Sequence, residues 1–200
     1  MRTKFFAAAL IASSALAAPA FAQDAGSGFT GPRAEAIVGW DRIEDGTANG
    51  GGRDGVVYGG QVGYDFQAGN AVFGVEGEIT GATTRATDTS VLAADDRLRV
   101  KAGRDLYAGA RVGFTVGDNA LVYAKGGYTN AGFDTRYTSG GTTIGGKENV
   151  DGWRLGAGGE VKLTDKLYAK AEYRFSKYDD DSSGIDAKRH QVLGGVGIRF

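Results

Sequence analysis

The last eleven residues, 190–200, read HQVLGGVGIRF, and this stretch decides the fold. Its apolar side chains occupy alternate positions: Val192, Val196, Ile198 and Phe200. The positions between them carry the polar side chains, including Arg199. Successive side chains of an extended strand point to opposite faces, so the stretch predicts a strand with one apolar and one polar face. A strand at the end of the sheet needs a second neighbour, and pairing with the first strand would close a barrel.

The same alternation recurs along the rest of the chain. In residues 71–80, for example, Phe73, Val75 and Ile79 alternate with Glu76 and Glu78. A soluble sheet with one wet face would also alternate, so this pattern alone leaves both kinds of barrel open. We expect strands over residues 34–41, 56–66, 71–80, 105–116, 120–131, 153–163, 167–176 and 190–200.

The connections between these eight strands alternate strictly in length. The long ones are residues 42–55, 81–103, 134–150 and 177–188, and the short ones are residues 67–70, 117–119 and 164–166. Antiparallel strands that cross a membrane place all connections of one parity on one side, and outer-membrane barrels have short periplasmic turns and long external loops. About ten residues per strand, tilted by about 40°, span roughly 25 Å, the height of the apolar band of such barrels. The sequence therefore predicts an all-β, eight-stranded antiparallel up-and-down transmembrane β-barrel.

Composition excludes several classes of function. The chain has 35 glycines in 200 residues, no cysteine, a single histidine and a formal net charge of −1. Disulfides, thiol nucleophiles and zinc sites built from cysteine or several histidines are therefore excluded, and no cofactor is expected. Lys and Arg are interspersed with Asp and Glu, so no basic field for nucleic acid exists.

Residues 1–22 differ in character from the rest. Arg2 and Lys4 precede an apolar run, and the small-residue site Ala-Phe-Ala at 20–22 follows it, as in a cleavable signal peptide. An uncleaved membrane anchor is the alternative, but the segment is short for a spanning helix and contains Pro19. We expect residues 1–22 to be removed and residues 23–200 to form the barrel in the cell outer membrane.

Charged side chains of both signs fall on the polar faces of neighbouring strands. We expect Glu76 and Glu78 near Arg111, Lys125 and Lys170 beside Glu160, and Glu35 near Arg199. Eight strands leave space for side chains and little else, so these pairs predict a plugged interior rather than an open pore. The predicted ion-pair network comprises Glu35, Glu76, Glu78, Arg111, Lys125, Arg154, Glu160, Lys170, Glu172, Arg174 and Arg199.

The signal peptide, the eight alternating strands, the loop parity and the ending GVGIRF resemble the small outer-membrane β-barrel proteins of Gram-negative bacteria. That family contains the OmpA transmembrane domain and porin-like surface antigens. The resemblance implies that the barrel-assembly machinery reads the C-terminal strand, through Val192, Val196, Ile198 and Phe200. It also implies contact with outer-membrane lipids and lipopolysaccharide, and we expect a monomer.

Three motifs point weakly to other chemistry. Asp179 and Asp181 match the opening of a calcium loop, but the position of the bidentate Glu holds His190, so a divalent-ion site there is a weak candidate. GTTIGGKE, residues 141–148, lacks the Ser or Thr of a phosphate-binding loop. His190 lacks a serine two residues away, so a lipid-modifying enzyme is not expected. The sequence favours a structural envelope protein that displays four loops, with an adhesin or surface receptor as the alternative. A small channel or a lipid-modifying membrane enzyme is less favoured.

Overall fold

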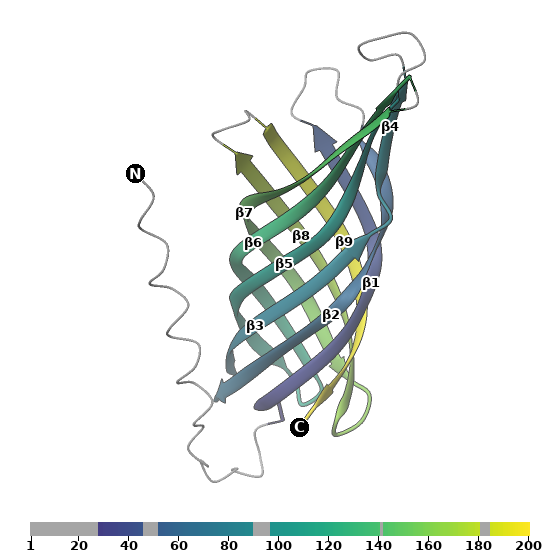
Figure 1. The fold of residues 1–200 in the computed structure, drawn as a ribbon. Helices are drawn as coiled ribbons and strands as arrows, with labels where there is room; N and C mark the ends of the chain where they lie inside the picture. The colour runs from purple at the N-terminus through teal and green to yellow at the C-terminus, as the bar shows by residue number, and fades with distance from the viewer. Residues whose placement is uncertain (1–27, 46–51, 90–96, 141, 181–184) are drawn as a thin grey trace.

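The computed structural model describes residues 28–45, 52–89, 97–140, 142–180 and 185–200 (Figure 1). The predicted signal peptide, residues 1–22, lies outside them. Among the described residues, no helix is long and apolar enough to cross a bilayer. The strands are β1 (Gly31–Asp45), β2 (Arg53–Ala68), β3 (Ala71–Ala82), β4 (Arg85–Thr89), β5 (Arg97–Val116), β6 (Ala120–Ser139), β7 (Thr142–Lys162), β8 (Leu167–Asp180) and β9 (Ile185–Arg199).

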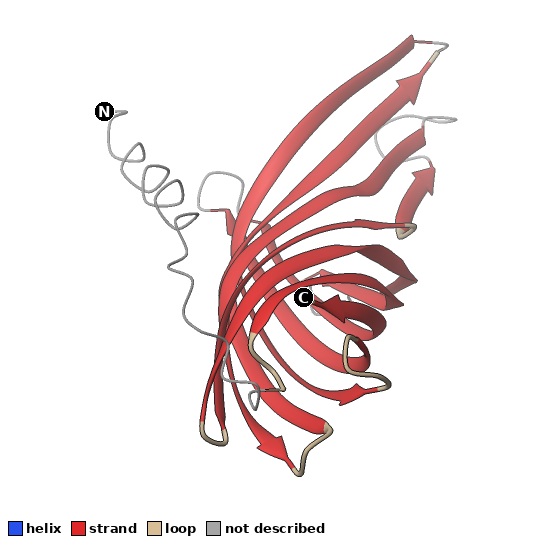
Figure 2. Cartoon of the chain, turned by 90° about the horizontal axis from the view of Figure 1, so that it is seen from below, coloured by secondary structure: helices blue, strands red, loops and turns tan. Residues whose placement is uncertain are grey.

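The sheet closes on itself at two places. The first and last strands, β1 and β9, pair antiparallel from Arg33↔Arg199 to Asp45↔Ala187, as the C-terminal pattern predicts. On the other side of the sheet, β3 and β4 both pair with β5, so these two strands form one stave of an eight-stave barrel (Figures 1 and 2). A closed barrel pairs the backbone groups of its wall, which the hydrocarbon of a bilayer requires.

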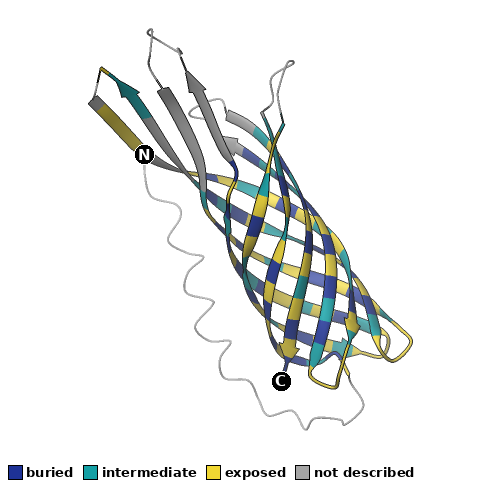
Figure 3. Cartoon of the chain, turned by 90° about the vertical axis from the view of Figure 1, so that its right-hand side faces the viewer, coloured by how far each residue is buried: buried dark blue, intermediate teal, exposed yellow. Residues whose placement is uncertain are grey.

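The burial pattern is the reverse of that in a soluble protein. Apolar side chains point outward and are exposed, for example Val62 at 63% and Val75 at 62%, whereas Glu160 and Arg174 point inward and are 0% exposed. Exposed and buried positions alternate along every strand of the wall (Figure 3). The predicted assignment of faces is confirmed. An apolar exterior and a charged interior suit a barrel whose outer solvent is lipid.

Aromatic side chains lie on the outer face toward both ends of the wall. Phe66 and Phe73 are opposite each other beside the turn that joins β2 and β3. Toward the other end, the rings of Trp153 and Phe175 stand 5.6 Å apart, and Trp40 is 42% exposed. Such rings favour the two membrane interfaces, so they mark the upper and lower boundaries of the membrane-embedded wall.

The connections separate as predicted, but the strands are longer than predicted on one side. The three short turns follow β2, β5 and β7, and they share an end with the C-terminus (Figure 1). All four predicted long loops, residues 42–55, 81–103, 134–150 and 177–188, are wrong in part, because strands of the sheet continue into each of them. Beyond the membrane both faces of a strand meet water, so apolar alternation is lost while cross-strand hydrogen bonding continues. A register shift between Ala102 and Asp105 in the β5–β6 pair separates this projecting part from the wall.

Candidate functional site: the charged barrel interior

Among the residues that the structure describes, the barrel interior contains equal numbers of buried cations and anions, each at most 6% exposed. Because opposite charges balance, these groups together carry no net charge when all of them are ionised. The eight cations are Arg33, Arg111, Lys125, Arg154, Lys170, Arg174, Arg189 and Arg199. The eight anions are Glu35, Asp41, Asp65, Glu76, Glu78, Asp105, Glu160 and Glu172.

The layer nearest the short turns, which we call the lower network, joins three arginines to two carboxylates. Arg199 donates to Glu160 Oε1 at 2.7 Å and to Asp65 Oδ2 at 2.9 Å. Arg111 donates through Nε to Asp65 Oδ1 at 2.9 Å and lies 3.3 Å from Glu160 Oε2. Arg33 Nε lies 3.1 Å from Asp65 Oδ2. Each carboxylate therefore bridges guanidinium groups that come from different strands.

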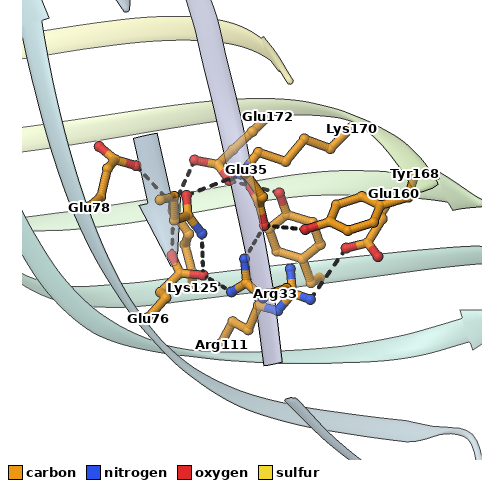
Figure 4. A network of polar contacts seen from close by, with 12 residues as sticks. Arg33, Glu35, Glu76, Glu78, Arg111, Lys125, Glu160, Tyr168, Lys170 and Glu172 are labelled. Carbon is orange, nitrogen blue, oxygen red and sulfur yellow. Dashed lines mark hydrogen bonds and ion pairs between the residues drawn. The ribbon is translucent and has the colours of Figure 1, made fainter. Parts of the chain in front are cut away.

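The middle network is organised by two lysines (Figure 4). Lys125 Nζ donates to Glu76 Oε1 at 2.7 Å and lies 2.9 Å from Glu172 Oε1. Lys170 forms ion pairs with Glu35 and, at 3.5 Å, with Glu172 Oε2. Glu172 thus joins the two lysines into one network. Further hydrogen bonds to these carboxylates come from Arg33, Gln61, Tyr123 and Tyr168.

The upper network lies toward the long hairpins. Arg174 Nη1 donates to both oxygens of Glu78 at 2.6 Å, and Arg154 connects Glu78, at 3.1 Å, to Asp105, at 2.5 Å. Arg189 continues the chain of contacts, because it donates to Asp105 at 2.8 Å and to Asp41 at 2.6 Å. The Asp41 carboxylate also accepts a hydrogen bond from Thr84 Oγ1 at 2.6 Å. Charge pairs therefore occupy the interior from its lower to its upper end.

These contacts act mainly between staves that are not neighbours in the sheet. Arg33 of β1 reaches Glu76 of β3, and Arg154 of β7 reaches Glu78 of β3. Removing one partner of a buried ion pair leaves an uncompensated charge, so the networks bind opposite walls together. An eight-stranded interior is just wide enough for such side chains to fill.

The predicted pairings differ from those observed, although all eleven predicted residues lie inside. Arg111 pairs with Asp65 and Glu160 rather than with Glu76 or Glu78. Lys170 stands opposite Glu160 in the β7–β8 register, yet its ion pairs are with Glu35 and Glu172. Lys125 and Arg199 likewise have partners other than those predicted. The prediction omitted five members of the network, namely Arg33, Asp41, Asp65, Asp105 and Arg189, although all five share the inward parity of their strands.

The other candidate residues lie elsewhere. His190 is on the outer face, where its Nδ1 is 2.7 Å from the Tyr173 hydroxyl and its ring centroid is 5.0 Å from that of Phe175. Residues 142–148 of the glycine-rich motif belong to β7, so they do not form a turn between a strand and a helix. The side chains of Asp179 and Asp181 lie outside the described part of the structure.

The C-terminal residues proposed as an assembly signal all lie on the outer face. Val192, Val196 and Ile198 are 50%, 51% and 45% exposed, and Phe200 is 66% exposed. The Phe200 amide donates to the Pro32 carbonyl at 2.9 Å, so the terminal residue is hydrogen-bonded across the β1–β9 closure. These side chains thus form one apolar ridge along the last strand.

A closed antiparallel sheet with an apolar exterior and a balanced, buried set of charges defines a transmembrane β-barrel. The chain belongs to the family described as outer membrane protein beta-barrel domain, whose family model matches residues 8–200. The protein is located in the outer membrane.

Curated relatives and solved structures agree with this assignment. The 25 kDa outer-membrane immunogenic protein of Brucella melitensis is 31% identical over 171 residues, which cover 81% of this chain and 74% of that protein. Ail, the attachment invasion locus protein of Yersinia pestis, has a similar fold with a TM-score of 0.53 and 18% identity, covering 85% of this chain and 99% of Ail. Neisserial surface protein A aligns with a TM-score of 0.55 and 15% identity, covering 86% of this chain and 98% of that protein.

Proposed function

We propose that the protein is a structural component of the outer membrane that anchors external hairpins at the cell surface and forms no open pore. The observation that carries this proposal is the matched set of eight buried cations and eight buried anions among the described residues. A porin needs a lumen wide enough for water, whereas eight staves leave room for side chains that here neutralise one another. The barrel would then serve as a rigid anchor.

Liposome swelling tests this proposal. Vesicles that contain the purified, folded protein should swell in an isotonic sugar solution no faster than empty vesicles. A porin of about 16 strands, whose channel is water-filled, is the positive control. Swelling comparable to that of the porin would overturn the structural role and favour a channel.

The partners proposed for the protein follow from its outer surface. The exposed apolar residues of the wall would contact acyl chains. The belt of aromatic side chains near the long hairpins, which includes Trp40 and Trp153, would lie at the level of the lipopolysaccharide headgroups. The ridge on β9 would be read by the barrel-assembly machinery. A monomer completes the proposal, because the barrel buries its charges without a second copy.

A role without enzymatic activity is part of the same proposal. The single histidine of the chain, His190, faces outward against Tyr173, away from the interior carboxylates. Folded protein incubated with lipid A or with unstructured peptides should leave both unchanged. Turnover that disappears in His190→Asn would establish a membrane enzyme instead.

A surface receptor is the second candidate, and the projecting hairpin of β6 and β7 favours it. The β6–β7 pairing continues to Ser139↔Thr142, whereas the β7–β8 pairing ends at Gly152↔Tyr178. Within the described chain, the other edge of β7 over residues 142–151 therefore has no neighbouring strand. An open edge can accept an extended peptide as an additional strand.

Immobilised extracellular-matrix proteins provide the probe for this role. A receptor should bind them as the wild type and lose binding when residues 135–146 are deleted from the hairpin. Unchanged heat-dependent gel mobility of the deletion variant would show that the barrel is intact. Equal binding by both proteins, or by neither, would exclude recognition through this edge.

A further inference from the structure

Phe29 lies before the barrel wall begins, yet its side chain is 1% exposed. Strand β1 starts at Gly31, so the phenyl ring does not belong to the alternating pattern of the sheet. It belongs to a buried hydrophobic cluster with Val72 of β3 and with Leu121 and Tyr123 of β6. These three side chains are inward-facing and buried, so the ring enters the barrel from its lower end.

Polar contacts from other staves hold the ring in this position. Lys162 Nζ lies 4.3 Å from the ring centroid of Phe29, and Arg199 Cζ lies 5.3 Å from it, both within the range of cation–π contacts. The backbone N–H of Phe29 donates to the side-chain Oε1 of Gln67 at 3.1 Å, and the backbone N–H of Gln67 donates to Thr30 Oγ1 at 3.1 Å. The segment is thus tied to β2, β7 and β9 as well as to β3 and β6.

Gly31 allows the chain to turn from the barrel wall into the lower end of the barrel interior. Its φ of +125° lies in a region that residues with a side chain rarely adopt. A Cβ at this position would also overlap a backbone oxygen of Phe200. The turn therefore requires glycine for two independent reasons.

We propose that Phe29, Thr30 and Gly31 form a periplasmic seal of the barrel. The seal covers the lower network, because Arg199 contacts both the Phe29 ring and the carboxylates of Glu160 and Asp65. The short turns of outer-membrane barrels face the periplasm, so this end meets periplasmic water. The segment would keep ions and water from the lower network. The proposal deepens the closed-barrel function on which it rests.

Thiol labelling tests the seal directly, because the natural chain has no cysteine. Leu121, which is 1% exposed and belongs to the same buried cluster as Phe29, is the reporter position. In L121C, a charged, membrane-impermeant thiol reagent should react slowly. Adding F29A should raise the reaction rate by about tenfold or more, as expected when a protected site becomes open. Adding F66A, which truncates a phenylalanine 59% exposed on the outer face, should leave the rate unchanged.

Equal labelling rates of L121C with and without F29A would overturn the seal. If F29A does not fold, as judged by gel mobility before and after heating, G31A provides the same test, because it displaces the segment without removing the ring. Faster labelling in L121C/G31A than in L121C would support the seal, and an equal rate would refute it. Failure of the closed-barrel function has a different signature, since liposomes with the wild-type protein would then swell.

Discussion

Replacing Glu160 with Gln should destabilise the barrel more than any conservative change of a surface carboxylate. Glu160 is 0% exposed and holds Arg199 at 2.7 Å and Arg111 at 3.3 Å. The E160Q variant keeps the shape of the side chain and removes its charge. Among the described buried residues, the interior then has eight cations and seven anions, and the guanidinium groups of Arg33, Arg111 and Arg199 share Asp65.

Breaking a buried ion pair by removing one partner costs about 3–5 kcal/mol. Both arginines keep Asp65, so we expect the lower end of that range, about 3 kcal/mol. Urea unfolding of the protein in micelles, followed by the fluorescence of Trp40 and Trp153, measures the free energy of unfolding. The matched control is E44Q, because Glu44 forms an ion pair with Arg42 at 3.1 Å while its side chain is 44% exposed. Exposed pairs contribute about 0–1 kcal/mol.

Removing Arg199 as well should recover part of the loss. In E160Q/R199Q the interior charge is balanced again, so the double variant should be more stable than the sum of the two single changes predicts. A free energy of unfolding for E160Q within about 0.5 kcal/mol of that of E44Q would refute the reasoning, because it would mean that water screens the interior.

Three further predictions concern the barrel as a whole. The folded protein should migrate at a different apparent mass before and after boiling, because a closed sheet resists detergent at low temperature; unchanged mobility would contradict closure. Deleting Phe200 should reduce the amount of folded protein in the outer membrane of cells, and normal assembly would show that this residue is not part of the signal. Mass spectrometry of the membrane form should find a chain that begins at Gln23, and an intact Met1 would contradict a cleaved signal peptide.

Alternation predicted the two faces well because lipid and the packed interior select opposite side chains at every second position. The outward direction of the Val192 side chain and the inward direction of the Arg199 side chain can therefore be predicted without any knowledge of their neighbours. Alternation is lost where this contrast ends. The pattern therefore predicts a loop over residues 134–150, whereas the structure has the upper parts of β6 and β7 there, which meet water on both faces.

The ion-pair partners could not be predicted from adjacent strands. Glu76 stands opposite Gly63 on β2 and Gly109 on β5, so its carboxylate extends past these glycines to Lys125 on β6 and to Arg33 on β1. Such contacts depend on the stagger of the strands and on side-chain length, which a sequence pattern does not give. Alternation does not reveal the role of Phe29, because this residue precedes the first alternating stretch.

Single-channel recording of the wild-type protein in planar bilayers decides between a plugged and an open barrel. The eight buried cations and eight buried anions should leave no continuous path for ions, so the current should stay at the baseline or show only small, brief events. Large and steady currents would contradict a plugged interior and would identify the protein as a pore.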